Sequence, residues 1–242
     1  MVISNNDFIR ITYVGKVKES GEVFDTTEKD VAKQQGIYDK KIQFKPSPIV
    51  VGAKHVITGL DEKLVGMEVG ETKTVIIPFE KGYGKRDPKL VQVVPMKTFK
   101  QQGMKPFPGM QIEGDGRVGR VQSVSGGRVR VDFNYKLAGK VLEYNVSIKE
   151  KVNKLEERIR LLLELHLPFA NPNDHGVKIK NKNLVIRLSD EAKLKKEVTL
   201  SKQYLSRDVF NFINLNTLTF EEVFKNPEVN KNKVDKKKNK AT

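Results

Sequence analysis

The sequence of 242 residues contains neither cysteine nor tryptophan. Without cysteine, the chain can form no disulfide, no thiolate metal site and no cysteine nucleophile. It also lacks any run of 18 or more apolar residues, which argues against a membrane-spanning helix. The first twenty residues show no basic segment followed by an apolar one, so we expect no secretory signal. Together these absences predict a cytoplasmic protein.

The sequence also gives no motif from which we expect a metal or nucleotide site. The histidines, His55, His166 and His175, lie far apart in the sequence and none forms a pair at ligand spacing, so we expect no metal site. Residues 114–119 do match the Gly-x-Gly-x-x-Gly pattern of dinucleotide-binding proteins. A strand and a glycine turn follow this match where a helix should begin, so we expect a β-turn there and no cofactor.

Basic residues outnumber acidic ones, with 45 Lys and Arg against 30 Asp and Glu and a formal net charge of +15. Part of this excess lies in residues 225–242, a lysine-rich segment with so little apolar surface that we expect it to be disordered. The charge suits a non-catalytic module that binds nucleic acid or ribosomes, and a solvated surface is the simpler explanation. Because aromatic residues are not interleaved with the basic runs, we expect no specific nucleic-acid partner.

The first half of the chain predicts strands around one short helix. Residues 7–17 alternate apolar and polar side chains, as a half-buried strand does, and a polar, exposed excursion is expected at residues 26–45. In the expected helix, Leu60 and Leu64 recur at helical spacing, and Thr58 with Asp61 has the pattern of a capping box. A helix this short needs a sheet to pack on.

The pattern changes to short strands between residues 85 and 136. Residues 118–124 and 129–133 flank a glycine turn and predict a hairpin. Residues 142–148 then resume a strand that fits the first sheet. We therefore predict that an all-β domain at 85–136 is inserted into a loop of a first domain formed by residues 1–84 and 137–150.

Residues 151–224 predict a separate C-terminal α+β module. Its first helix is apolar on more than one face, because Leu161 and Leu165 widen the stripe of apolar residues. A strand is expected at 184–188, and Ser201 is placed to cap a second helix. A helix with two apolar faces favours self-association into a homodimer. A client-binding extension and an intramolecular brace are the alternatives.

Several short motifs, taken in order, resemble the FKBP family of peptidyl-prolyl isomerases. They are Tyr13, Gly21-x-Val23-Phe24-Asp25, Val56-Ile57-x-Gly59-Leu60, Gly82-Tyr83-Gly84 and Leu142-x-Tyr144-x-Val146. Residues 83–95 and 132–140 are similar to the SlyD subgroup, in which an extra β domain called insert-in-flap interrupts the loop after the catalytic tyrosine. The resemblance covers residues 5–150 and implies an α+β fold with a twisted antiparallel sheet wrapped round the short helix.

The resemblance also implies a prolyl isomerase site between the sheet and the helix. The positions that match the family's pocket are Tyr13, Phe24, Asp25, Val56, Ile57, Leu60, Tyr83 and Tyr144. Drug-binding members often carry Trp where this chain has Leu60, so the pocket floor is shallower, which bears on macrolide affinity more than on activity. The closing-strand aromatic is usually Phe, and the hydroxyl of Tyr144 needs a hydrogen-bond partner.

The predicted inserted domain carries flexible apolar side chains in a region broken by prolines. They are Val93, Val94, Met96, Phe99, Met104, Phe107 and Met110. Such side chains suit a promiscuous surface, and the SlyD resemblance implies that they bind unfolded polypeptide. The alternative is that they fill a small core. The predicted function is prolyl isomerisation with chaperone activity on unfolded or proline-containing polypeptides, without the nickel handling of the His- and Cys-rich SlyD tail, which is missing here.

Overall fold

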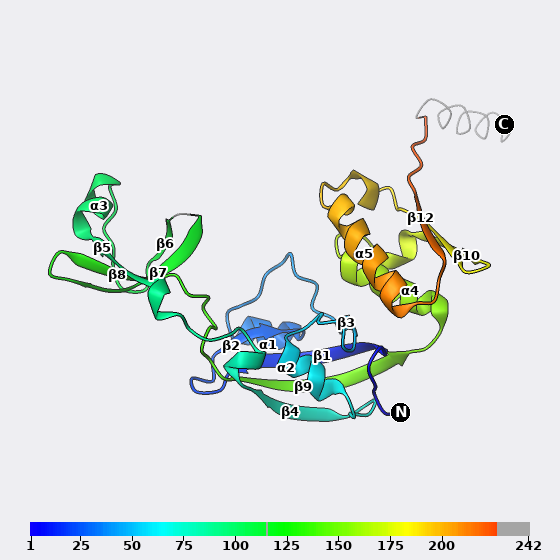
Figure 1. Ribbon diagram of the computed structural model, residues 1–242, viewed down its shortest axis with the longest axis horizontal. Coiled ribbons are helices and arrows are strands. Elements are labelled where there is room, and N and C mark those ends of the chain that lie inside the picture. The colour runs from blue at the N-terminus through cyan, green and yellow to red at the C-terminus, as the bar shows by residue number, and fades with distance from the viewer. Residues whose placement is uncertain (115, 227–242) are drawn as a thin grey trace, which may run out of the picture.

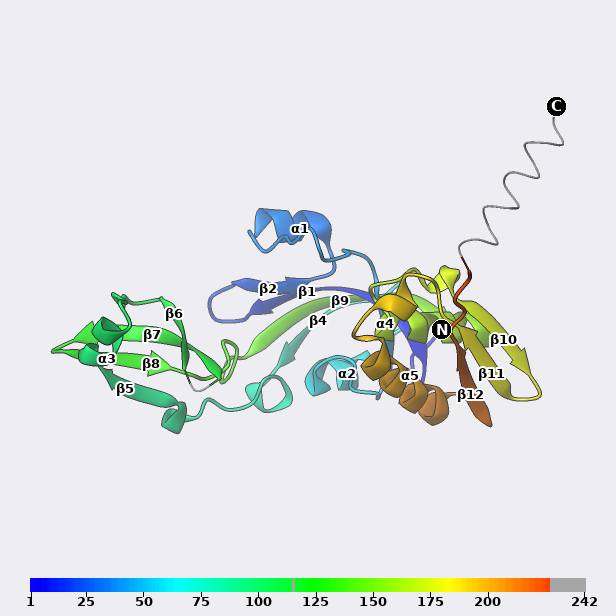
Figure 2. The ribbon, with the colours of Figure 1, turned by 90° about the horizontal axis from the view of Figure 1, so that it is seen from above.

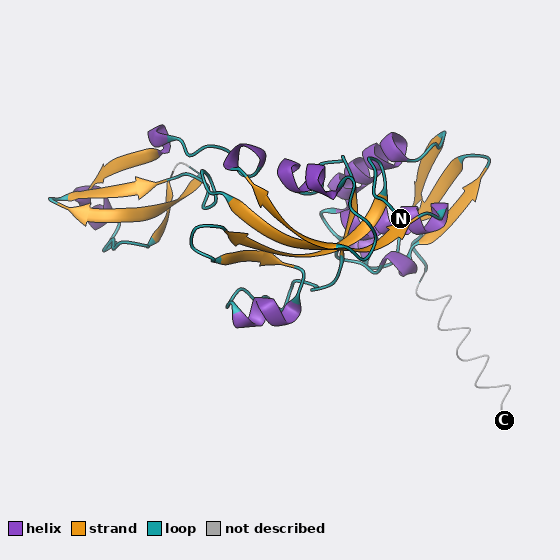
Figure 3. Cartoon of the chain, turned by 90° about the horizontal axis from the view of Figure 1, so that it is seen from below, coloured by secondary structure: helices purple, strands orange, loops and turns teal. Residues whose placement is uncertain are grey.

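A computed structural model describes residues 1–114 and 116–226 of the chain. The predicted disordered tail at 225–242 lies outside these residues except for its first two positions. The strands gather in three groups along the long axis of the molecule (Figure 3). A five-stranded sheet occupies the middle, a four-stranded sheet one end and a three-stranded sheet with two helices the other (Figure 1).

The central sheet is antiparallel throughout. Its strands are β1 (Phe8–Val17), β2 (Val23–Thr26), β3 (Ser47–Val50), β4 (Thr72–Ile77) and β9 (Leu142–Val152). β9 lies between β1 and β4, while β2 and β3 follow each other along the free edge of β1. Phe8 and Ile9 point to opposite faces of β1 and both are fully buried, because other elements cover the two faces of the sheet at this end.

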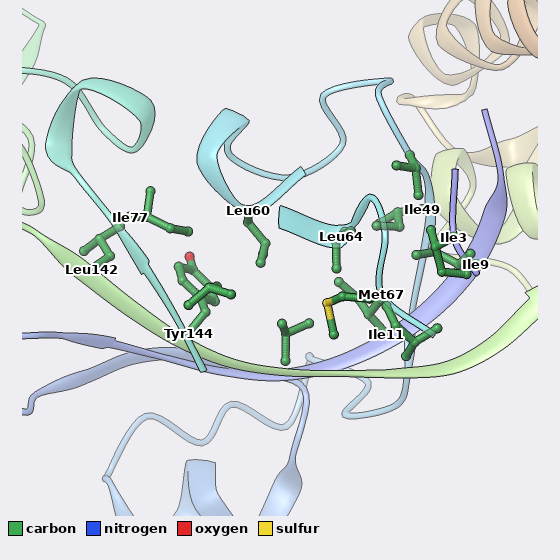
Figure 4. Close-up of a cluster of buried hydrophobic side chains, with 14 of the residues drawn as sticks. Ile3, Ile9, Ile11, Ile49, Leu60, Leu64, Met67, Ile77, Leu142 and Tyr144 are labelled. Atoms are coloured by element: carbon green, nitrogen blue, oxygen red, sulfur yellow. The ribbon is translucent and has the colours of Figure 1, made fainter. Parts of the chain in front are cut away.

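The helix α2 (Thr58–Leu64) packs on one face of this sheet. Leu60, Leu64 and Met67 are buried against side chains of β1, β4 and β9 (Figure 4), so the predicted apolar face is confirmed. A Cβ at Gly59 would lie 2.4 Å from Cγ2 of Ile77, and glycine therefore allows the close approach of α2 to β4. The short 3₁₀ turn η1 (Phe79–Lys81) follows β4.

The predicted capping box of α2 is wrong. Ile57 occupies the N-cap position, and Thr58 is an exposed first residue of the helix. The carboxylate of Asp61 instead accepts hydrogen bonds from the backbone N–H groups of Gly52 and Lys54, at 2.8 and 3.0 Å. Asp61 is buried and ties down the loop before the helix, because the loop folds back over it and offers two N–H donors.

The polar excursion at 26–45 contains a helix that the sequence pattern did not predict. α1 (Lys29–Gln34) lies on the opposite side of the central sheet from α2 (Figure 2). Ala32 is its one buried residue, and Tyr38 stacks on Phe44 beside it with ring centroids 5.5 Å apart. One small apolar residue gives too weak a periodic signal to reveal a helix.

A second sheet is formed by residues between β4 and β9. Its elements are η2 (Pro88–Leu90), β5 (Val91–Pro95), α3 (Met96–Gln101), β6 (Gln111–Gly114), β7 (Arg117–Ser125) and β8 (Arg128–Asp132). The strands run antiparallel in the order β5-β8-β7-β6. The predicted hairpin is confirmed, and Gly126 and Gly127 at its turn both have positive φ, at 54° and 72°, as a two-residue turn requires. The all-β prediction is wrong in one respect, since α3 is helical.

The glycine pattern at residues 114–119 belongs to a hairpin and not to a nucleotide-binding loop. Gly114 pairs with Arg117 at the end of β6 and β7, which are antiparallel neighbours. The β-turn expected from the sequence is therefore consistent with the pairing, and the strand β7 continues where a dinucleotide-binding protein would begin a helix.

The C-terminal elements pack on the end of the central sheet. They are α4 (Leu155–His166), η3 (Pro172–Asp174), β10 (Gly176–Lys180), β11 (Asn183–Arg187), η4 (Ala192–Leu194), α5 (Val198–Phe212) and β12 (Thr217–Glu221). β11 pairs antiparallel with β10 and parallel with β12. Ser201 lies inside α5, so the prediction that it caps the helix is wrong, and β9 reaches Val152, inside the range predicted for the C-terminal module.

The two apolar faces of α4 both find partners within the chain. Ile159, Leu161 and Leu162 are fully buried in a cluster that joins α5 and β11 to Phe8 and Val50 of the central sheet. This continuous core corresponds to the intramolecular brace among the alternatives for α4. None of the helices in residues 1–114 and 116–226 is long and apolar enough to cross a membrane.

Candidate active site

The structure brings the predicted pocket residues together beside α2. Leu60 and Tyr144 are buried members of the apolar cluster between α2 and the central sheet. The half-buried members packed against this cluster include Tyr13, Phe24, Val56, Ile57 and Tyr83. Residues separated by up to 131 positions in the chain thus meet because β1, β2, β9 and the ends of α2 and β4 converge here (Figure 4).

Asp25 joins this group through a hydrogen bond. The hydroxyl of Tyr13 donates to Oδ2 of Asp25 at 2.9 Å, and Asp25 pairs with Gly15, two residues along β1 from Tyr13. Burial and the nearby charge of Asp25 raise the pKa of Tyr13 far above its ordinary value. Tyr13 therefore stays a neutral phenol at any physiological pH.

An aromatic wall lies above Leu60. The ring of Phe24 meets Tyr83 and Tyr144 edge-on, with centroids 6.3 and 5.8 Å apart, and Tyr13 lies 5.7 Å from Tyr144. The phenols of Tyr83 and Tyr144 lie close enough to influence each other's pKa, so the Tyr144 hydroxyl has a polar neighbour. Burial is the main cause that raises the pKa of both phenols.

Gly15 is a site residue that sequence reasoning missed. It lies on β1 directly beneath the aromatic wall, and a Cβ there would come within 2.8 Å of Cε1 of Tyr144 and 3.1 Å of Cζ of Phe24. The two rings can reach their observed positions because the backbone leaves this space open. A glycine inside an otherwise regular strand is the signal that indicates such a close approach.

Tyr135 is a second missed residue. It lies in the segment that returns from β8 to β9, and its ring is 60% exposed. The ring centroid is 4.9 Å from that of Tyr83, at an interplanar angle of 39°. Tyr135 therefore extends the aromatic wall outward, toward the second sheet.

A polar network fastens together the two chain segments that connect the central and second sheets. The guanidinium of Arg86 donates to Oδ2 of Asp132 at 2.6 and 3.1 Å, and the backbone N–H of Asp87 donates to Oδ1 of Asn134 at 2.7 Å. Burial opposes ionisation of Asp132, but hydrogen bonds from Arg86 and Asn134 outweigh it and lower the pKa of Asp132. Through these hydrogen bonds, the segment that enters the second sheet and the segment that leaves it are held side by side.

The side chains predicted to bind clients are divided between a core and a surface. Phe99 is 3% exposed and belongs to the core of the second sheet with Val121, Val129 and Val131. Val94, Met96, Met104 and Met110 are half-buried against that core. Phe107 and Val93 are 60% exposed. Phe99 thus fills the small core, whereas Phe107 and Val93 lie on the surface.

Two cavities lie near the aromatic wall. One of about 640 Å³ lies between the second sheet and the returning segment, lined among others by Val118, Arg120, Tyr135 and Ala138. The other, of about 390 Å³, lies between the sheet and α4 and is lined by Tyr13 and Asp25 at one side. Of these two cavities, only the first is lined by Tyr135, whose ring packs against that of Tyr83.

Two of the histidines that are far apart in the sequence meet in the fold. His55 and His166 both contact the carboxylate of Asp208 on α5, at 2.7 and 2.8 Å. Their separation in the sequence concealed a contact that forms only when α4 and α5 pack on the central sheet. His175 is buried elsewhere, where its Nδ1 accepts the N–H of Ser189 at 3.1 Å.

Comparisons with known proteins match all three parts of the chain. A family model described as FKBP-type peptidyl-prolyl cis-trans isomerase matches residues 2–100. Models described as the FKBP26 IF domain and the FKBP26 C-terminal region match residues 92–137 and 155–225. The short-type peptidyl-prolyl cis-trans isomerase of Methanocaldococcus jannaschii is 38% identical over 149 residues, which cover 62% of this chain and 94% of that protein.

SlyD proteins are further relatives. The FKBP-type peptidyl-prolyl cis-trans isomerase SlyD of Aeromonas hydrophila is 35% identical over 136 residues, or 54% of this chain and 57% of that protein. That of Helicobacter pylori is 28% identical over 117 residues, or 46% of this chain and 62% of that protein. The chain belongs to the family of FKBP-type peptidyl-prolyl cis-trans isomerases, and the resemblance predicted from its motifs is confirmed. Its activity is peptidyl-prolyl isomerisation.

Proposed function

We propose that the apolar pocket beside α2 accelerates X-Pro isomerisation without a covalent step. Rotation about the peptide bond is opposed by amide resonance, with a barrier of about 18–20 kcal/mol. The twisted transition state has lost this resonance and is less polar than the planar amide. A dry, apolar wall therefore disfavours the planar state relative to the twisted one. Phe24, Val56, Ile57 and Leu60 supply that wall.

The observation that carries this proposal is the packing of the aromatic rings around one apolar floor, with neutral hydroxyls at its edge. Tyr83 is half-buried, and its ring packs against those of Phe24 and Tyr135, which orients its hydroxyl toward a substrate carbonyl. Tyr13 and Asp25 orient the polar edge through their own bond. The raised pKa values of the phenols keep them as donors.

The test compares pocket variants on a proline-containing peptide. Tyr83→Ala and Asp25→Ala should lower kcat/KM for cis-trans exchange, measured by NMR exchange spectroscopy at equilibrium. Tyr38→Ala is the matched control, because Tyr38 is a partly exposed tyrosine that stacks on Phe44, away from the pocket. Unchanged exchange in both pocket variants would show that the active site lies elsewhere.

We also propose that the second sheet is an inserted client-binding domain of the insert-in-flap kind, which gives the enzyme chaperone activity. The exposed side chains of Val93 and Phe107 and the half-buried methionines around Phe99 support a surface that adapts to unfolded polypeptide. The cavity beside Tyr135 lies between the second sheet and the returning segment, next to the ring that packs against Tyr83. The proposed partners are unfolded or proline-containing polypeptides in the cytoplasm, and we expect no specific nucleic acid.

The chaperone proposal is tested by separating it from catalysis on a short peptide. Phe107→Ser should weaken suppression of aggregation of an unfolded protein while leaving isomerisation of a tetrapeptide unchanged. Leu194→Ser serves as the control, because Leu194 is also an exposed apolar residue, at 71%, but lies on η4 among the C-terminal elements. Equal chaperone activity in wild type and Phe107→Ser would refute the assignment of this surface.

A homodimer through the C-terminal elements stays part of the proposal. The support is the exposed apolar side chains that α5 carries, where Leu200, Tyr204 and Phe210 are 53%, 44% and 48% exposed. Sedimentation of the full chain against Leu200→Glu decides the point. A monomer in both cases would discard the dimer.

A further inference from the structure

A buried polar cluster joins the C-terminal elements to the loop that carries Val56 and Ile57. Asp208 on α5 is 1% exposed, and its Oδ2 lies 2.7 Å from Nε2 of His55 and 2.8 Å from Nε2 of His166. The guanidinium of Arg207 donates to Oδ1 of Asp208 at 2.9 Å. His55 directly precedes Val56 and Ile57 in the sequence, so this contact links α5 to the loop that carries these two pocket residues.

The backbone determines which nitrogen of His55 carries the proton. The N–H of Val50 donates to Nδ1 of His55 at 3.1 Å, so Nδ1 is the unprotonated nitrogen and Nε2 bears the proton. Burial opposes ionisation of Asp208, but hydrogen bonds from Arg207, His55 and His166 outweigh it and lower the pKa of Asp208. Asp208 is therefore a carboxylate that accepts an N–H bond from each imidazole.

The same three side chains have the composition of a metal site, since their ligand atoms lie within 4.8 Å of one another. A histidine that binds a metal through Nε2 donates the proton on its other ring nitrogen to an acceptor. Nδ1 of His55 faces a donor instead, the N–H of Val50. The geometry thus favours a hydrogen-bonded cluster over a metal site.

The loop between β3 and α2 is held from two sides. Gly52 and Lys54 have positive φ, at 83° and 60°, and both donate their backbone N–H to Asp61. A lysine rarely adopts this left-handed conformation, so the surrounding contacts must hold the loop in place. Asp61 provides the contacts on the side of α2, and Asp208 provides one through His55 on the side of α5.

We propose that Asp208 is a positioning residue for prolyl isomerisation. By fixing His55 it sets the end of the loop and, with it, the positions of Val56 and Ile57 at the pocket floor. The C-terminal elements then contribute to catalysis although none of them lines the aromatic wall. This inference rests on the pocket proposed above, and a misplacement of catalytic groups by about 1 Å is enough to lower a rate strongly.

The experiment uses the full chain and measures kcat and KM for NMR-detected exchange of a proline peptide. Asp208→Ala should lower kcat/KM by about fivefold, with Asp208→Asn intermediate because its amide oxygen still accepts one N–H. In a His55→Gln background, Asp208→Ala should cause no further loss. The amide hydrogens of Val50 and Lys54 should exchange faster with solvent in Asp208→Ala, which reports the loop independently of activity.

Glu164→Gln is the matched control. Glu164 on α4 is also buried and forms ion pairs with Arg10 at 2.7 Å and Lys45 at 2.8 Å, so its loss weakens the same packing between α4 and the central sheet without touching the loop. We expect Glu164→Gln to lower the thermal midpoint but to keep kcat/KM and the loop's exchange rates. Should Asp208→Ala fail to fold, Asp208→Asn decides the question alone.

Three results would overturn the proposal. They are full kcat/KM in a folded Asp208 variant, an equal loss in Glu164→Gln, and additive losses in the double variant with His55→Gln. Stoichiometric binding of Zn²⁺ to the wild type but not to Asp208→Asn would make the cluster a metal site instead. A Phe24→Ala variant measured in parallel tests the pocket itself, so if it is inactive while Asp208→Ala is fully active, only the positioning role fails.

Discussion

The hydroxyl of Tyr13 on β1 donates a hydrogen bond of 2.9 Å to Oδ2 of Asp25 on β2. This bond lies at the rim of the aromatic pocket, where Tyr13 also meets the ring of Tyr144. It links the stability of the strand pair to the geometry of the site, because Asp25 on β2 pairs with Gly15, two residues along β1 from Tyr13.

The first prediction removes this bond without removing the ring. Tyr13→Phe should cost about 1 kcal/mol in the free energy of unfolding, since it removes one hydrogen bond from the half-buried Tyr13 to the exposed Asp25. The isomerisation rate should fall by a few-fold because the polar rim loses its fixed direction. Urea unfolding and NMR exchange measure the two effects, and an unchanged rate would show that the bond serves stability alone.

The second prediction concerns the space beneath the aromatic rings. Gly15→Ala should destabilise the protein by about 1–3 kcal/mol, because the new methyl group forces the rings of Phe24 and Tyr144 apart. It should also lower kcat/KM. Gly114→Ala on β6 is the control, since its Cβ would meet the Phe133 ring only at an ordinary distance of 3.8 Å. Equal stability of the two variants would contradict the close packing at Gly15.

The third prediction concerns Tyr135, whose exposed ring stacks on Tyr83. As part of the wall, Tyr135 would pack on a bound peptide, and such a ring contact contributes roughly 1 kcal/mol, so Tyr135→Ala should raise KM for a proline peptide about fivefold. We expect kcat to change little, because Tyr135 lies outside the apolar floor. A matched measurement on Tyr38→Ala should give wild-type values. A fall in kcat at constant KM would place Tyr135 in the chemical step instead.

The fourth prediction is a loss of stability in mild acid. Burial lowers the pKa of His166 and of His175 below the ordinary value of 6.5, and neither the charge of Asp208 nor that of Asp174 restores it. Because the unfolded chain takes up protons on these residues at a higher pH than the folded chain, the free energy of unfolding should decrease as pH falls below about 6.5. The decrease is at most about 1.4 kcal/mol per pH unit for each histidine.

Urea unfolding at about pH 7.5 and pH 5.5 measures this dependence. His175→Gln should weaken it, because the glutamine oxygen can still accept the N–H of Ser189 but takes up no proton. A variant with the same steepness as the wild type would show that His175 does not contribute. A protein that is more stable at the lower pH would contradict the direction for both histidines.

Local patterns in the sequence were sufficient for most of the central sheet. The alternation in residues 7–17 predicted β1, and the Gly126-Gly127 turn predicted the β7–β8 hairpin, because strand periodicity and turn residues act over a few positions. The motif order also predicted which residues would meet beside α2. Whether these residues act as proposed is left to the variants above.

Contacts between distant segments could not be read in this way. His55 and Asp208 are 153 positions apart and belong to segments with unrelated local patterns. Asp61 fits a capping box by its spacing, yet in the fold the returning loop offers it better donors. Phe99 was predicted to bind clients because it lies among other flexible apolar residues. It is buried because the short α3 directs its side chain toward the core of the second sheet. In each case tertiary packing, and not local propensity, decides the role.

The most direct test of the account is to map where a proline-containing tetrapeptide binds, by following backbone amide shifts of the labelled full chain during titration. The pocket account predicts the largest shifts at Gly15, Phe24, Val56, Tyr83 and Tyr144, which surround the apolar floor. Phe24→Ala should abolish these shifts together with the exchange activity. Shifts confined to the second sheet, or to the C-terminal elements α4 and α5, would contradict the central claim.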